Sequence, residues 1–491
     1  MSVFSATIEV GVCSNFINSM NSDVTKKACD SEIKKYMNYK VFALLTILFS
    51  CFFFFVLDKN EPTLGQNQIP TVSANESTAL KYPSLSDRNL KIETVVTGFA
   101  FPTGITFLGN NEFLLLEKDT GNVYRIVNGN ISNVVIHLNV SSEDERGLLG
   151  VVASTNDKSK QDNNFVFLYF TSCSQENTNT NNTRNCGNFL YRYEFDTEKY
   201  ILVNPKLILK LPFLPGPSHN GGVIDLDNEN NVYVTIGDLQ PSAFNKNQTG
   251  FDTRAQNIMN GTAPDGRAGI LRLNFEGKPV DNGILGDKFP LNLYYAYGIR
   301  NSFGIDFDPL SGNLWDTENG PRFGDEINLV EPGFNSGWER IQGIWKLNQT
   351  KNKNGIYNES EYNVKLVNFD GKGKYSAPEF EWEKPVGPTA LIFLQSDKLG
   401  AEYKNDILVG SVEKGIIYHF PLTEDRKSLS LKDDLADLVF NKKDDARQII
   451  FGLNFGIITD MEVGPDGYLY VVSGDRGTDE GAVYRIVPNR K

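Results

Sequence analysis

Short apolar segments that alternate with glycine- and aspartate-rich turns recur along the chain from about residue 90 to its end. Each unit holds one apolar segment, a tight turn and a second segment in which an aromatic residue stands before a basic one. Alternating apolar and polar positions with many β-branched and aromatic residues are typical of strands. The paired segments are 111–126, 165–170 with 189–195, 231–238 with 268–275, 312–320 with 325–330, 405–411 with 415–420, and 467–486.

The repetition of one strand pair predicts a ring of small sheets. Units of roughly 65 residues are longer than a plain four-stranded blade, which indicates loop insertions. Six copies predict an all-β fold, a six-bladed β-propeller over residues 90–491. Two stacked sheets or a β-helix would not explain long, unequal units that share one internal pair. A lone strand at 90–98 precedes the first unit, so we expect it to pair with the last unit and close the ring.

The amino-terminal part of the chain has a different pattern. Residues 41–57 are apolar or nearly so, with Lys40 just before them and Asp58 just after. This length is at the short limit for a membrane span, and positive charge upstream places the following chain on the extracytoplasmic side. The pattern predicts a single-pass anchor in the cell membrane at 39–58. A signal peptide is the alternative.

The remaining segments complete the predicted domain organisation. We expect a short polar tail at 1–38 and a flexible linker at 59–89, where Pro, Ser and Asn are frequent. Cys173 and Cys186 flank an Asn/Thr-rich stretch that we interpret as an exposed loop. Export predicts a disulfide that closes this loop, and two free thiols are the alternative.

Composition excludes several classes of protein. The chain of 491 residues has 48 Lys and Arg against 61 Asp and Glu, a formal charge of −13. That balance argues against nucleic acid as a partner, because phosphate binding needs clustered cations. Three histidines leave no room for a His-rich metal centre. Five cysteines without a Cys-x-x-Cys pair exclude a zinc ribbon or an iron–sulfur cluster.

Three residues are candidates for acid–base and electrostatic catalysis. His219 lies in the Gly-rich segment GPSHNGG, and a polar loop is a poor place for a core histidine. Asp238 follows a strand and is suited to orient His219 and raise its basicity, although turn aspartates are common. Arg300, in YGIRNSFG, can donate a planar fork to an oxyanion or carbonyl. A surface salt bridge is the alternative for Arg300.

A candidate metal site lies in the segment ENGPRFGDEINLV. Gly320 and Pro321 expose backbone carbonyls, and Asp325 and Glu326 add carboxylates. Hard oxygen ligands at close spacing suit Ca²⁺. The spacing does not follow an EF-hand, and an ordinary turn has a similar composition.

Taken in order, these segments resemble the glucose/sorbosone dehydrogenase family. The family includes soluble glucose dehydrogenases and aldose sugar dehydrogenases that use pyrroloquinoline quinone (PQQ). The resemblance runs from about residue 90 to 488 and is most specific over 295–338. ERGLLGVV, SHNGG, VYVTIGD and GPDGYLYVV support it. It implies the same six-bladed propeller.

The resemblance also implies a function, an exported, membrane-tethered sugar dehydrogenase-like oxidoreductase. It implies that His219 takes the proton of a sugar hydroxyl and that Asp238 supports this base. Hydride then passes to the Ca-bound quinone, which Arg300 polarises and Asn301 holds. An external electron acceptor completes the reaction.

The resemblance assigns the metal ligands more narrowly than the composition does. The carbonyls of Gly320 and Pro321 correspond to ligands of the calcium ion that sits on the quinone. Glu326 corresponds to a further calcium site in some members, where Ser336 replaces its tyrosine partner.

The chain departs from the family where cations meet the three carboxylates of the quinone. Glu413 stands at the lysine position, with Lys414 one residue on, and Ile457 and Thr459 replace paired arginines. Each lost charge-assisted hydrogen bond costs about 1.5–3 kcal/mol. The candidate replacement cations are Lys414, Arg322 and Arg476.

Two further departures lie next to the predicted base. Glu145 stands where the family has a glutamine and is predicted to bind cofactor, and Ser218 replaces an acid. These changes leave a second function open. The propeller would then have lost quinone binding and act as a Ca-dependent hydrolase or lactonase, or as a cell-surface binding module.

Overall fold

The chain divides into two compact units, residues 1–75 and 76–491. The computed structural model describes residues 82–154, 165–178, 181–240, 253–343, 345–346, 357–358, 365–441, 446–474 and 480–489. The predicted tail, the predicted anchor at 39–58 and most of the predicted linker lie outside these residues. Within the described ranges, no helix is long and apolar enough to cross a bilayer.

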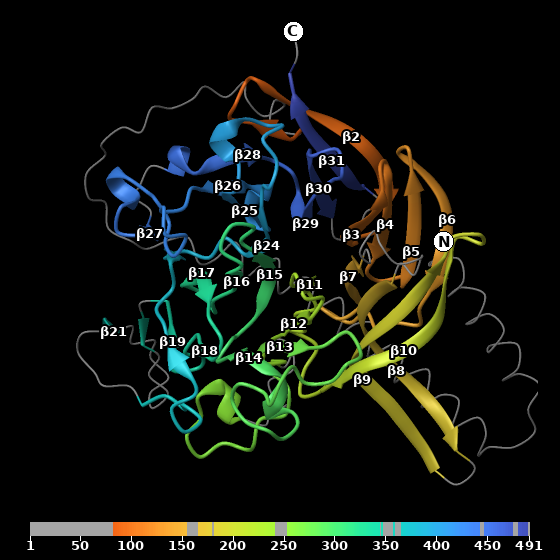
Figure 1. Ribbon diagram of the computed structural model, residues 1–491, viewed down its shortest axis with the longest axis vertical. Coiled ribbons are helices and arrows are strands. Elements are labelled where there is room, and N and C mark those ends of the chain that lie inside the picture. The colour runs from red at the N-terminus through yellow and green to blue at the C-terminus, as the bar shows by residue number, and fades with distance from the viewer. Residues whose placement is uncertain are drawn as a thin grey trace, which may run out of the picture. The chain divides into compact units, whose positions relative to one another are not determined.

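The second unit consists of small sheets arranged around one axis, as Figure 1 shows. The strands described form seven sheets, of which six contain four to six strands each. The helices in the same residues are short 3-10 turns, which agrees with the absence of helical patterns in the sequence. These turns are η1 (Arg254–Gln256), η2 (Leu291–Leu293), η4 (Ala401–Tyr403), η5 (Glu413–Gly415), η6 (Asp433–Leu435) and η7 (Ala446–Gln448). The predicted all-β propeller is therefore confirmed.

The first three of the larger sheets follow one another along the chain. The first contains β3 (Pro102–Gly109), β4 (Glu112–Glu117), β5 (Asn122–Val127) and β6 (Asn130–His137). The second contains β7 (Leu148–Ser154), β8 (Phe165–Thr178), β9 (Asn181–Asp196) and β10 (Ile201–Leu211). The third contains β11 (Ile224–Leu226), β12 (Val232–Ile236), β13 (Gly269–Leu273), β14 (Tyr294–Tyr297), β18 (Phe334–Asn335) and β22 (Lys374–Tyr375).

The other sheets complete the ring and add one small sheet. The fourth contains β15 (Ser302–Phe307), β16 (Leu314–Glu318), β17 (Asp325–Val330), β23 (Phe380–Trp382) and β27 (Val439–Phe440). The fifth contains β24 (Pro388–Phe393), β25 (Ile407–Ser411), β26 (Ile417–Phe420), β28 (Ile450–Leu453) and β1 (Ser84–Leu85). The sixth contains β29 (Ile457–Val463), β30 (Leu469–Gly474), β31 (Gly481–Pro488) and β2 (Leu90–Phe99). The small sheet contains β19 (Ile341–Gln342), β20 (Trp345–Lys346) and β21 (Tyr357–Asn358).

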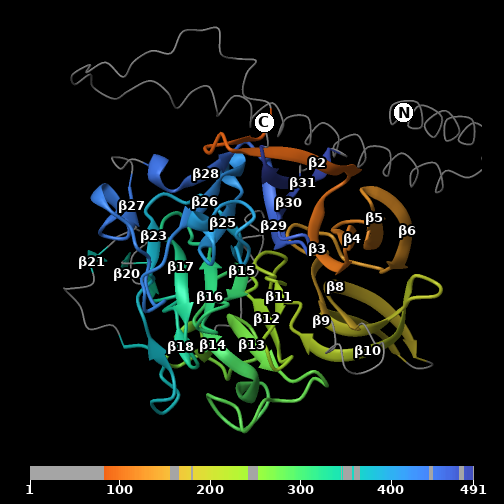
Figure 2. The ribbon, with the colours of Figure 1, turned by 45° about the horizontal axis from the view of Figure 1, so that its top comes forward.

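Strand pairing between the two ends of the propeller closes the ring, as the sequence predicted. β2 runs antiparallel to β31, with Leu90 opposite Pro488 and Thr94 opposite Tyr484. The two strands lie side by side in both ribbon views (Figures 1 and 2). The sixth sheet is thus built from residues almost 400 positions apart, so neither end alone can complete it.

The apolar core lies between neighbouring sheets. Leu114 and Leu116 of the first sheet pack in one buried cluster with Leu168 of the second. Leu408 of the fifth sheet shares a cluster with Val471 of the sixth in the same way. Burial of one such side chain contributes about 1.5–3 kcal/mol to the stability of the folded chain. Because these contacts hold the flat faces of the sheets together, only the innermost strands face the axis.

The Asn/Thr-rich segment between Cys173 and Cys186 differs from the loop that we predicted. β8 continues to Thr178 and β9 begins at Asn181, so these polar residues belong to the ends of a long antiparallel ribbon (Figure 1). A two-stranded ribbon is held by hydrogen bonds between backbone groups, which residues of any polarity can form. The Asn/Thr-rich composition therefore indicated a loop where the chain forms strands. Cys173 lies opposite Cys186, and the predicted disulfide joins them.

Candidate active site

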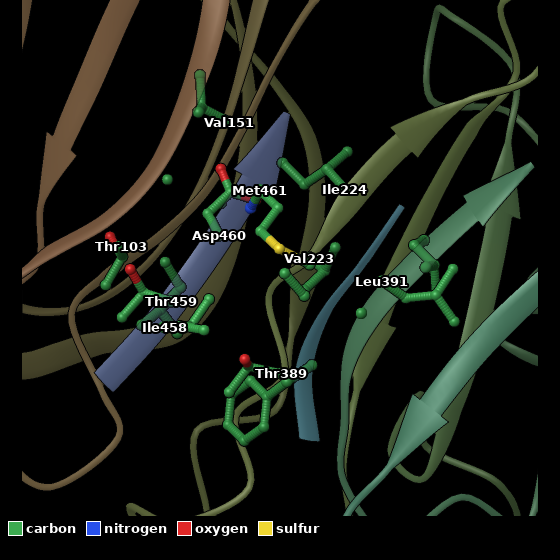
Figure 3. Close-up of a pocket in the computed structure, with 18 of the residues that line it drawn as sticks. Thr103, Val151, Val223, Ile224, Thr389, Leu391, Ile458, Thr459, Asp460 and Met461 are labelled. Carbon is green, nitrogen blue, oxygen red and sulfur yellow. The ribbon is translucent and has the colours of Figure 1, made fainter. Parts of the chain in front are cut away.

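A cavity of about 910 Å³ lies on the axis of the propeller. The first strand of each of the six larger sheets lines it, namely β3, β7, β11, β15, β24 and β29. Figure 3 shows Thr103, Val151, Ile224, Leu391 and Asp460, each from a different one of these strands, around a common space. Residues that are far apart in the sequence therefore meet in one cavity, as expected for a propeller.

His219 lines this cavity and is only 7% exposed. Its Nδ1 lies 2.6 Å from Oδ1 of Asp238, which is 2% exposed. Gly237 allows this approach, because a Cβ atom there would lie 2.5 Å from the carbonyl oxygen of Arg300 and 2.7 Å from that of His219. The glycine of the TIGD motif thus brings the predicted base and the predicted carboxylate together.

Asp238 accepts two further hydrogen bonds on its other carboxylate oxygen. Oδ2 accepts from Nε1 of Trp338 at 2.8 Å and from Nε2 of Gln240 at 3.0 Å. Burial alone would raise the pKa of Asp238, but attraction to His219, its hydrogen bond and the charge of Arg300 lower it below its ordinary value. An ionised Asp238 accepts the Nδ1–H of the imidazole, which leaves Nε2 as a proton acceptor.

Arg300 lines the same cavity and is held by its neighbours on several sides. Its Nη1 donates to the carbonyl of Asn319 at 2.8 Å and to that of Gly320 at 3.0 Å. Its guanidinium lies 5.4 Å from the ring centre of Trp338. Burial lowers the pKa of Arg300, and nearby carboxylates counteract that effect. Among the described residues, its Nε has no hydrogen-bond partner, so one donor is left for a ligand.

Glu145 and Asn301 lie next to the predicted base. Oε2 of Glu145 accepts the backbone N–H of His219 at 2.6 Å and the Nδ2–H of Asn301 at 3.4 Å. Both residues line the cavity. Sequence reasoning named both of them as cofactor ligands, and the structure places them within reach of the same bound molecule.

The residues predicted to bind calcium have different surroundings. Asp325 accepts the backbone N–H groups of Gly320 at 2.8 Å and Val386 at 2.7 Å, so it braces the turn. Glu326 is the next residue of β17 and accepts a hydrogen bond from Gln342 instead, at 2.9 Å. Gly320 lines the cavity, whereas Pro321 does not. In the described parts of the chain, no group of three or more His, Cys, Asp or Glu residues is arranged to hold a metal.

The structure does not bring Lys414 to the cavity. This side chain is exposed on the turn η5, where its backbone has a φ of 61°. Ile457 and Thr459 do line the cavity, and Oγ1 of Thr459 donates to the carbonyl of Pro102 at 2.9 Å. Arg476 lies outside the described residues. The cations that line the cavity within those residues are Arg300 and Lys118, and the sequence analysis did not single out Lys118.

Four carboxyl groups on the innermost strands were not predicted from the sequence. They are Asp225, Asp306, Asp460 and Glu462. The available signal was a motif repeated on three of these strands, IDLD at 224–227, IDFD at 305–308 and TDME at 459–462. We name these four residues the axial acids.

Two of the axial acids connect neighbouring sheets. Oδ2 of Asp306 accepts the backbone N–H of Phe393 at 2.7 Å, and Oδ2 of Asp460 accepts that of Ile105 at 2.8 Å. Burial raises the pKa of both aspartates to about 7. Burial and the charges of the other three axial acids raise the pKa of Glu462 well above its ordinary value. These groups hold protons at a pH where an exposed carboxyl is ionised.

Comparison with known proteins agrees with this architecture. Quinoprotein glucose dehydrogenase B of Acinetobacter calcoaceticus is 24% identical over 87% of this chain and 95% of that protein. The apo crystal structure of the soluble aldose sugar dehydrogenase of Escherichia coli superposes with a TM-score of 0.59 at 20% identity, over 82% of this chain and 100% of that one. The PQQ-bound aldose sugar dehydrogenase of Streptomyces coelicolor gives a TM-score of 0.55 at 20% identity, over 83% and 98%.

The family assignment rests on a match over most of the propeller. The family model described as Glucose / Sorbosone dehydrogenase matches residues 99–485, which is well over half of the chain. The match includes every residue of the cavity discussed above. The chain belongs to the glucose/sorbosone dehydrogenase family.

Proposed function

We propose that this protein is a sugar dehydrogenase-like oxidoreductase in which His219 is the base. The observation that carries the proposal is the 2.6 Å contact between Nδ1 of His219 and the ionised Asp238, in a cavity that also holds Arg300. A buried carboxylate fixes the tautomer of the imidazole and stabilises its protonated form. Two relatives are named as dehydrogenases of glucose and of aldose sugars. We therefore propose a small sugar as the substrate.

The cavity fits the reacting end of a quinone such as PQQ, which one solved relative binds. Arg300 would hold it, because its buried Nε is a donor without a partner among the described residues. Asn301 lines the cavity beside Arg300 and would lie against the same molecule. A quinone bound there supplies an acceptor for a hydride. Ile457 and Thr459 offer no charge to its carboxylates, so we expect weaker binding than in a chain with arginines at these positions.

The residues of the chain itself would act on the sugar hydroxyl. Nε2 of His219 takes its proton, and Asp238 stabilises the imidazolium that results. The positive charge of Arg300 stabilises negative charge that develops on the opposite side of the reacting bond. His219 and Asp238 are 7% and 2% exposed, so little water surrounds them, which strengthens their electrostatic interaction.

Four finer points belong to the same proposal. We count each of the six sheets with four or more strands as one blade. We propose Ca²⁺ as a second cofactor near the carbonyls of Gly320 and Pro321, and we route no step through it. We propose that residues 39–58 tether the propeller to the extracytoplasmic side of the cell membrane. The electron acceptor would then be a separate, external molecule.

The test is a dye-coupled assay on the purified full chain with added PQQ and Ca²⁺. We expect aldose-dependent dye reduction and saturable binding of PQQ by calorimetry. If neither occurs, the proposed oxidation is wrong. The replaced cation positions at Ile457 and Thr459 favour the second candidate in that case, a hydrolase, lactonase or surface binding module that works without a quinone. Lactone hydrolysis and glycan binding would then be measured directly.

A further inference from the structure

We propose that Glu145 makes the cavity selective for amino sugars, in which a protonated amine lies close to the reacting hydroxyl. This inference rests on the proposed oxidation and names its substrate class. Glu145 lines the cavity next to His219, the proposed base. Its Oε2 accepts hydrogen bonds from His219 and Asn301, which fix the carboxylate in place. The hydrogen bonds of Glu145 with described residues are made by Oε2, so Oε1 is available to a ligand in the cavity.

Asn301 provides a second acceptor beside that oxygen. Its Nδ2 donates to Glu145, and this bond sets the orientation of the amide. The other atom, Oδ1, is buried in a residue that is 2% exposed and has no partner among the described residues. A buried acceptor without a donor is costly, and a ligand that donates to it is favoured. An ammonium group donates three hydrogen bonds and accepts none, whereas a hydroxyl donates only one.

The charges around Glu145 also favour a cation. Nζ of Lys118 is paired with Oδ1 of Asp119 at 2.7 Å. Arg300 attracts both Asp238 and Glu145, so its single positive charge cannot balance both carboxylates. Asp144, at the rim of the cavity, adds a further carboxylate. A positive group on the substrate would therefore meet an excess of negative charge next to the proposed base.

The experiment measures binding of glucosamine, glucose and N-acetylglucosamine to the purified full chain by calorimetry at slightly acid pH, where the free amine is protonated. We expect glucosamine to bind at least about tenfold more tightly than the two neutral sugars. Glu145→Gln should remove this advantage. Glu143→Gln is the matched control, because Glu143 lies in the same loop, is 72% exposed in its side chain and does not line the cavity. The control should keep the advantage.

A second measurement uses the unchanged protein, so it does not depend on how the variant folds. At alkaline pH the amine of glucosamine is neutral, and its advantage over glucose should disappear. Equal binding of all three sugars at acid pH, or an advantage that persists in Glu145→Gln, overturns the inference. Oxidation of neutral aldoses in the dye assay would leave the proposed function standing in that case. Selective binding of glucosamine without oxidation of any sugar supports the role of Glu145 and overturns the proposed function.

Discussion

Two groups of carboxyl side chains behave in opposite ways, namely Asp238, which contacts the cavity residue His219, and the axial acids, which line the cavity itself. Asp238 is surrounded by donors and positive charge, and its pKa is lowered. Burial raises the pKa values of the axial acids Asp306, Asp460 and Glu462, and at Glu462 the charges of the other axial acids add to this effect. Both groups are buried, so burial alone does not decide their charge. At Asp238 the hydrogen-bond donors and positive charge reverse the effect of burial, and only this carboxylate is prepared to support a base at neutral pH.

The largest effect is expected from removal of the base. His219→Ala should reduce the turnover of the quinone-loaded protein by about 10²–10⁴-fold, because no other described group holds the same position against Asp238. Steady-state dye reduction measures this loss. His137→Ala is the control, since His137 is exposed at the end of β6 and contacts Asn122 outside the cavity. A similar loss in both variants would indicate damage to the fold rather than loss of a base.

A smaller loss is expected when Asp238 keeps its shape but loses its charge. Asp238→Asn should lower turnover by about a hundredfold, because an amide cannot stabilise the imidazolium. It can also donate to Nδ1 of His219 and select the wrong tautomer. Binding of PQQ, measured by calorimetry, should change little. Full activity in this variant would show that the carboxylate of Asp238 has no part in the reaction.

The axial acids predict an effect on stability instead of activity. The raised pKa of Glu462 means that the folded chain keeps this proton to a higher pH than the unfolded chain does. The associated stability is complete below the unfolded pKa of about 4.3 and is lost as pH rises through the folded pKa. Glu462→Gln is neutral at every pH. It should therefore raise the melting temperature at pH near 8 by about 2–4 °C and change it less at pH near 5.

The control for this prediction is Glu331→Gln, because Glu331 is exposed and lies 3.7 Å from Lys427. That variant should show no gain at alkaline pH. An unchanged melting curve for Glu462→Gln at both pH values would mean that the axial acids do not repel one another in the folded protein.

Patterns within one sheet could be predicted from the sequence. The strand pairs follow from alternation and turn residues, and the isolated strand at 90–98 indicated ring closure with β31. His219 and Asp238 are only 19 residues apart and flank the hairpin of β11 and β12, so their contact was also predictable. Each of these features depends on local periodicity, which can be recognised in one amino-acid sequence without a structure.

Features that depend on contacts between sheets could not be predicted in the same way. An aspartate such as Asp306 or Asp460 resembles an ordinary turn residue until the ring places it against the next strand. Lys414 looked suited to replace a lost cation, but its left-handed backbone turns it outward. The polar segment before Cys186 was predicted to be a loop, because it has no alternation of apolar and polar residues. Its strands pair through backbone groups, and such pairing does not require that alternation.

The most direct test of the central claim is oxidation of an aldose that carries deuterium at its anomeric carbon, by the full chain supplied with PQQ and Ca²⁺. The account predicts measurable dye reduction, a slower rate with the deuterated sugar, and loss of both in His219→Ala. Oxidation that is as fast in His219→Ala as in the unchanged protein, or no oxidation of any aldose, would contradict it.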